Sequence, residues 1–274
     1  MMTPFHGSLM VLALTAAGLP GCMRPPESTP SQMRQGLVLV LPGIEGPSPF
    51  NASIANGLRD GGVDGAIEIF DWGTPAGPLT WWLHLTDYDR NVEQARRLSD
   101  EIRRYKRSHP DAPLDLVAHS GGAGIALLAL EDLPREVRVN SVVLLGAAVS
   151  PDYDLNRALN ATQRGIWNFY SKMDVGFLGA GTLVFGTVDR AHRVAAGAVG
   201  FDTSRSFGDP RGDPYSKLHQ VPYQAGMAGT WNLGTHIGWS SPGFVREWLA
   251  PLIRAGYPPE PRGPALTFTS DRTP

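Results

Sequence analysis

The chain has 274 residues, and its 24 basic and 26 acidic residues give a net charge of −2. This near-neutral charge argues against a nucleic-acid partner, because proteins that bind nucleic acids carry a basic face. The length suits one large or two small domains, and a hydrophobic content of 42% can fill a sizeable core.

The N-terminus carries a short apolar segment. Residues 9–19, LMVLALTAAGL, are too few to span a bilayer but match the apolar region of a signal peptide. The sequence LPGC at residues 19–22 resembles the lipobox of bacterial lipoproteins, in which the cysteine is lipidated. This resemblance implies that residues 1–22 are a signal peptide with a lipobox-like end and that the protein is exported. Lipid on Cys22 would then tether it to a membrane surface.

Two alternatives for this N-terminal region stay open. One is a signal of the ordinary cleaved type, which would give a periplasmic or secreted protein. The other is that Cys22 is a buried free thiol behind a misassigned start. The first eight residues contain no Lys or Arg, and Pro20 is unusual in a lipobox. Cys22 is the only cysteine, so an intrachain disulfide is excluded.

Composition divides the remaining chain into three parts. Residues 23–35 are rich in Pro, Ser and Gln and are expected to form a flexible tether. Residues 36–255 form one continuous domain without an internal repeat. Residues 256–274 contain many prolines and are expected to form a loosely ordered tail.

Strand and helix patterns alternate along the domain. Apolar runs predict buried strands at Leu37–Leu41, Ala66–Phe70, Leu114–His119, Val139–Leu145 and Ile166–Ser171. Helical periodicity or apolar character predicts helices at Phe50–Leu58, Val92–Tyr105, Gly122–Leu133 and Phe244–Ile253. This alternation predicts an α/β fold with a mostly parallel central sheet and helices on both faces.

One serine lies where the predicted strand Leu114–His119 turns into a helix. The sequence there, Ala118-His119-Ser120-Gly121-Gly122, resembles the nucleophile elbow G-x-S-x-G of the α/β-hydrolase family, with alanine in place of the first glycine. Ligands of parallel sheets bind at this edge. The alternative is a plain strand-to-helix turn. The resemblance extends from about Gly36 to Ile253 and implies an α/β-hydrolase fold with Ser120 as nucleophile.

The family order of serine, acid and histidine implies the other two catalytic residues. Asp174 follows the predicted strand Ile166–Ser171 and is the expected acid, with Asp152 and Asp154 as alternatives one strand earlier. His236 lies in a glycine-rich loop before the last helix and is the expected base.

The other histidines are expected to have no part in catalysis. His119 adjoins the serine in a strand and therefore points away from it, toward packing or a supporting hydrogen bond. His192 and His219 are expected at the surface or in turns, while His84 and His109 precede the serine and do not fit the family order.

The resemblance also implies two main-chain donors for the oxyanion of the intermediate. They are the N–H of Gly121 and, from the loop after the first strand, the N–H of Ile44. Glu45 lies in the same loop and is expected to be a salt-bridged loop residue, with a substrate-facing group as the alternative.

These residues predict a serine hydrolase that cleaves a carboxylic ester through an acyl-enzyme, without metal or organic cofactor. The segments Trp72–Tyr88 and Val175–Val188 are apolar and are expected either to shape the substrate pocket or to pack on the core. The partners expected are an ester substrate, small or lipid, and a membrane surface. The alternatives are a non-catalytic envelope binding protein, or a thioesterase or perhydrolase of the same fold.

Overall fold

The structure is a computed structural model that describes residues 28–73, 87–174, 194–204 and 213–255. The predicted signal peptide with Cys22 and the predicted tail at 256–274 lie outside these residues, as do most of the two apolar segments at 72–88 and 175–188. In the ranges described, no helix combines the length and apolar character needed to cross a membrane.

The described residues form a six-stranded sheet in which every neighbouring pair is parallel. Its order is β2-β1-β3-β4-β5-β6, so β3, β4 and β5 are consecutive neighbours in the middle of the sheet. The strands are β1 (Leu37–Leu41), β2 (Ala66–Ile69), β3 (Leu114–His119), β4 (Val139–Leu145), β5 (Thr162–Tyr170) and β6 (Leu218–Pro222).

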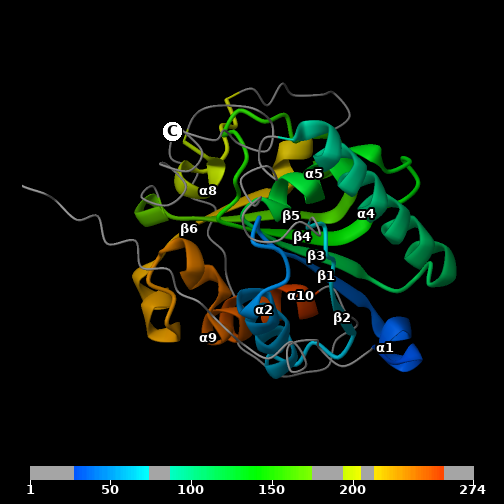
Figure 1. The fold of residues 1–274 in the computed structure, drawn as a ribbon, viewed down its shortest axis with the longest axis horizontal. Helices are drawn as coiled ribbons and strands as arrows, with labels where there is room; N and C mark the ends of the chain where they lie inside the picture. Colours follow the sequence, from blue (N-terminus) through cyan, green and yellow to red (C-terminus); the bar gives the residue numbers. More distant parts are fainter. Residues whose placement is uncertain (1–27, 74–86, 175–193, 205–212, 256–274) are drawn as a thin grey trace, which may run out of the picture.

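Helices cover both faces of this sheet (Figure 1). On one face lie α4 (Tyr88–Ser108), α5 (Gly122–Asp132), α6 (Asn156–Asn160) and α8 (Ala196–Val199); on the other lie α2 (Pro49–Asp60), α9 (Pro242–Phe244) and α10 (Ala250–Arg254). Alternate side chains of β1 enter the two cores, with Leu39 packed toward α4 and α5, and Val40 packed toward α2 and α10. The predicted α/β fold with a mostly parallel sheet covered on both faces is therefore confirmed.

Most predicted elements are present, with differences at the chain's later elements. β5 begins at Thr162, earlier than expected, and β6 was not predicted. The closing helix runs from Pro242 to Arg254 but contains a π-helical segment, Val245–Leu249. Pro251 lacks the N–H that a regular α-helix would donate to the carbonyl four residues earlier, and the wider π-helical turn before Pro251 accommodates that loss.

Part of the segment predicted as a flexible tether is helical. Residues Pro30–Gln35 form α1, which Thr29 caps, and Gln32 completes the capping box. The hydroxyl of Tyr105 in α4 donates to the carbonyl of Met33 at 2.8 Å. The described end of this segment is thus attached to the domain rather than free of it.

Candidate active site

Ser120 lies at the turn between β3 and α5 in a conformation rare for a residue with a side chain. Its φ is +53°, in the left-handed region, which costs roughly 1–2 kcal/mol outside glycine. Its N–H donates to Leu145 at 2.9 Å, and its carbonyl accepts the N–H groups of Ala123 and Ala148, both at 3.1 Å. The strand and helix therefore hold the strained turn that an elbow requires.

The glycines after Ser120 allow the loop that follows β1 to pack on the elbow. A Cβ added to Gly121 would lie 2.9 Å from Ile44 Cγ2, and one added to Gly122 would lie 2.4 Å from the Pro42 carbonyl oxygen. Both positions exclude any larger residue. The structure thus brings Ile44 and Gly121, the two predicted oxyanion donors, into contact.

Asp174 lies just beyond the carboxyl end of β5. The chain there forms a short 3₁₀ turn, Lys172–Asp174, in which the N–H of Asp174 donates to the carbonyl of Ser171 at 2.9 Å. The hydroxyl of Ser171 also accepts the N–H of Met173 at 3.1 Å. Because β3 and β5 are parallel, this turn places Asp174 at the same edge of the sheet as Ser120.

His236 reaches this edge from the loop after Trp231. Gly234, with φ +74°, allows a sharp turn in which Asn232 Oδ1 accepts the Gly234 N–H at 3.0 Å. His236 then begins a 3₁₀ helix, and its Nδ1 lies 3.0 Å from Asp174 Oδ2.

The Asp174–His236 hydrogen bond is enclosed by protein. Asp174 is 1% exposed and His236 is 6% exposed. Because a carboxylate oxygen accepts, His236 Nδ1 carries the hydrogen and Nε2 keeps its lone pair. The bond therefore selects the tautomer in which Nε2 can accept a proton.

Gly146, the residue after β4, is part of this arrangement and was not predicted. Its φ is +55°, and an added Cβ would lie 3.0 Å from Asp174 Oδ2 and 3.2 Å from His236 Nδ1. Asp174 and His236 therefore meet over the end of β4, at a residue that has no side chain. The position of Gly146 directly after a buried parallel strand is the sequence signal that could have identified it.

The alternative acids form other contacts. Asp152 accepts a hydrogen bond from Ser150 Oγ, and Asp154 accepts the N–H and side-chain amide of Asn156 at 2.9 and 2.8 Å. Of these three candidates, Asp174 is the one that the structure joins to His236.

Two other histidines among the described residues stack on aromatic rings. His109 lies on Tyr105 with centroids 4.8 Å apart, and His219 lies on Trp167 at 4.3 Å. His219 was expected at the surface or in a turn, and the structure places it in strand β6. His84 and His192 lie outside the described residues.

His119 supports the His236 loop, in agreement with its predicted role. Its Nε2 lies 3.1 Å from the His236 carbonyl oxygen. The centroids of the two imidazole rings are 4.8 Å apart, and the ring planes are tilted by 38°. Since a carbonyl only accepts, His119 Nε2 donates and its Nδ1 is unprotonated. Burial, and then the nearby His236, lower the pKa of His119 to about 3, so it is neutral.

The Glu45 carboxyl group lies near a histidine of the site. In the described part of the chain it forms no ion pair with Lys or Arg, and its nearest titratable neighbour is His119, whose Nδ1 lies 3.9 Å from Oε1. Burial raises the pKa of this carboxyl, while main-chain hydrogen bonds and the nearby His236 oppose the rise. The expected salt bridge is therefore not found in these residues.

Exposed apolar residues lie close to Asp174 and His236 in the sequence. Trp231, Met173, Leu233 and Ile237 are all more than half exposed, and two of them adjoin Asp174 and His236 in sequence. Trp72, at the start of the predicted pocket segment, is instead fully buried and donates to the Pro42 carbonyl at 2.8 Å.

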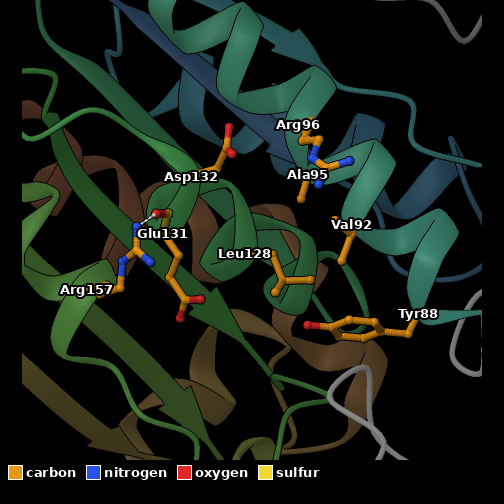
Figure 2. A pocket seen from close by; sticks show the side chains of 8 residues that line it. All are labelled: Tyr88, Val92, Ala95, Arg96, Leu128, Glu131, Asp132 and Arg157. Atoms are coloured by element: carbon orange, nitrogen blue, oxygen red, sulfur yellow. Dashed lines mark hydrogen bonds between the residues drawn. The ribbon is translucent and has the colours of Figure 1, made fainter.

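A separate hollow lies between α4, α5 and α6. It has a volume of about 270 Å³ and is lined by Arg96, Glu131, Asp132 and Arg157 among others, and by neither Ser120, Asp174 nor His236 (Figure 2). Within the residues described, no cluster of three His, Cys, Asp or Glu side chains is arranged to hold a metal ion.

Comparisons with known proteins give likenesses in structure and none in sequence. No family model and no curated protein matches the chain. Solved structures similar to it include esterase PE8, with 14% identity, a TM-score of 0.47, and coverage of 81% of this chain and 92% of that one. A cutinase-like protein from Cryptococcus sp. has 14% identity and a TM-score of 0.41, over 81% and 94% of the two chains.

A third similar structure is RedJ, a thioesterase from the prodiginine biosynthetic pathway in Streptomyces coelicolor, with 14% identity, a TM-score of 0.40 and coverage of 91% and 97%. The parallel sheet and the strand-turn-helix elbow at Ser120 are features of the α/β-hydrolase fold. A fold hosts many reactions, so function is inferred from the residues of the site.

Proposed function

We propose that the protein is a serine hydrolase that cleaves carboxylic esters through an acyl-enzyme on Ser120. The observation that carries this proposal is the buried 3.0 Å hydrogen bond between Asp174 and His236, at the sheet edge where Ser120 forms a strained turn. A serine hydroxyl is a weak nucleophile, and an oriented histidine base supplies the activation it needs.

In the proposed reaction, Ser120 Oγ attacks the ester carbonyl while His236 Nε2 takes the hydroxyl proton. The tetrahedral intermediate collapses, the ester C–O bond breaks, and His236 returns the proton to the departing alcohol. Water then attacks the acyl-enzyme by the same proton relay and releases the acid. Asp174 holds the imidazole tautomer and stabilises the imidazolium.

The N–H groups of Gly121 and Ile44 are the proposed donors to the oxyanion. Their support is the contact between the loop after β1 and the elbow. Gly121 precedes the first turn of α5, and amides at a helix N-terminus have no acceptor within the helix. Loss of one such donor costs roughly 10²–10³ in turnover.

An ester with an apolar acyl or alcohol part fits this site best. The exposed apolar side chains beside Asp174 and His236, Met173 and Ile237, offer such a surface. A thioester is the second substrate class, because it reacts by the same acyl transfer. A non-catalytic binding protein would have no need of the buried acid–base pair next to a strained serine.

Labelling with a fluorophosphonate probe tests the proposal. The mature domain should be labelled stoichiometrically, and Ser120→Ala should not be labelled. A series of p-nitrophenyl esters and matched thioesters would then define acyl length and leaving group. A folded protein that neither reacts with the probe nor hydrolyses any of these esters would favour the binding-protein alternative.

We also propose that the protein is exported and anchored by lipid on Cys22. The support is the apolar segment at 9–19 and the LPGC sequence that ends it. In a bacterial host the full chain should enter the detergent phase of a Triton X-114 extract. Cys22→Ser should stay in the aqueous phase if lipid is the anchor, and equal partition of both chains would contradict the proposal.

A further inference from the structure

An acidic side chain lies against the nucleophile. Glu45, in the loop between β1 and α2, folds back over Gly43. A Cβ added to Gly43 would lie 2.3 Å from Glu45 Oε2 and 3.1 Å from Ser120 Cβ. The carboxyl group and the serine side chain therefore border the same small volume, which is open because residue 43 is glycine.

The base lies on another side of the same carboxyl group. Glu45 Oε1 is 3.9 Å from His119 Nδ1, and the His119 ring contacts that of His236. His236 also acts electrostatically on the Glu45 carboxyl. Glu45 is thus a neighbour of both Ser120 and His236, the two residues proposed to perform the reaction.

The negative charge at Glu45 has polar neighbours but no neutralising partner in the described part of the chain. Ser48 Oγ lies 3.5 Å from Oε1, and main-chain hydrogen bonds reach the carboxyl group. His119 is neutral, and its unprotonated Nδ1 has nothing to donate. The Glu45 side chain is 33% exposed, so a substrate in the site can approach it.

We propose that Glu45 sets the charge preference of the site, so that it favours esters with a cationic group a few ångströms from the scissile carbonyl. This inference rests on the proposed ester hydrolysis. Two opposite charges separated by several ångströms at a partly exposed site attract strongly enough for a preference of roughly 10-fold. An anionic group in the same position would be disfavoured to a similar degree.

Matched pairs of esters test this preference. On the alcohol side, a choline ester is compared with the 3,3-dimethylbutyl ester of the same acid, which has the same shape without the charge. On the acyl side, p-nitrophenyl 4-(trimethylammonio)butanoate is compared with p-nitrophenyl 5,5-dimethylhexanoate. In at least one pair the cationic ester should have a kcat/KM roughly 10-fold above its neutral partner at pH 8 and low salt.

Glu45→Gln should reduce that ratio to about one, whatever its effect on each rate. Glu136→Gln is the matched control, because it removes one exposed acidic charge ahead of β4, at the opposite edge of the sheet, and should keep the ratio. In wild type, the ratio should also shrink when the ionic strength rises from about 0.01 to 0.5 M, because salt screens the attraction.

Neutral esters that are hydrolysed without any preference for the cation in either pair would overturn the role of Glu45. A preference that persists in Glu45→Gln would overturn it as well. Failure of the proposed function looks different: wild type would hydrolyse neither member of a pair and would not react with the fluorophosphonate probe.

Discussion

Gly146 offers a direct test of the proposed acid–base pair, because Gly146→Ala would press a methyl group against both of its members. The added Cβ would lie 3.0 Å from Asp174 Oδ2, 3.2 Å from His236 Nδ1 and 3.2 Å from Trp239 Cδ1. These contacts are shorter than ordinary ones, so the carboxylate and the ring must each move by a few tenths of an ångström.

The expected loss of activity exceeds the expected loss of stability. Alanine in the left-handed region at φ +55° costs roughly 1–2 kcal/mol, which lowers the Tm of a domain this size by about 2–8 °C. Misplacement of a catalytic base can cost about 100-fold in rate. We therefore expect kcat for a p-nitrophenyl ester to fall by roughly 10- to 100-fold while the protein stays folded.

Gly62→Ala is the control that separates strain from contact. Gly62 has φ +81°, but its added Cβ would make only ordinary contacts of 3.6 Å with Arg254, far from the site. Both variants should therefore lose similar stability by thermal unfolding, and only Gly146→Ala should lose activity. If Gly146→Ala kept kcat within about threefold of the Gly62→Ala value, the Asp174–His236 pair would not be the acid and base.

Three further predictions concern single side chains. Asp174→Asn should lower kcat for ester hydrolysis roughly 10³- to 10⁴-fold, because the amide no longer holds the reactive tautomer of His236. Asp154→Asn should leave kcat unchanged. The reverse result would make Asp154 the acid. Burial raises the pKa of Asp115 to about 6. Between about pH 4 and 6 the folded state therefore binds one more proton than the unfolded state. The free energy of unfolding should fall by up to about 3 kcal/mol as the pH rises through this window. Urea unfolding should show this fall in wild type relative to Asp115→Asn, and parallel pH profiles of the two would contradict it. His119 acts in the opposite direction, because its pKa falls from 6.5 to about 3 on folding. Its contribution to the stability of the fold is present above pH 6.5 and is lost as the pH falls toward 3. His119→Gln should therefore lose less stability than wild type as the pH falls over this range.

The central strands and the helices of the domain were predictable because each buries its side chains in a regular pattern. β1, β3 and β4 are covered on both faces, so every residue in them is buried. β1 is wholly apolar, while β3 and β4 are mostly apolar and carry the buried polar residues Asp115, His119, Asn140 and Ser141. β6 was missed because it is an edge strand with only Val221 buried, and its centre is polar. Gln220 there bonds the main chain of Phe201 at 2.6 and 2.8 Å, a tertiary contact that leaves no periodic signal.

Three features could be inferred from the amino-acid sequence: the alternation of strands and helices, the serine between small residues, and the order in which an acid and a histidine follow it. These features are local, because they depend on burial patterns and on backbone conformations that neighbouring residues allow. Three others depend on how distant segments pack: Asp174 rather than Asp152 or Asp154 bonds to His236, Gly146 leaves room for that bond, and Glu45 lies against Ser120. Those residues come from the ends of β1, β3, β4 and β5 and from the loop at His236, and parallel pairing brings strand ends together at one edge whatever their distance in the chain.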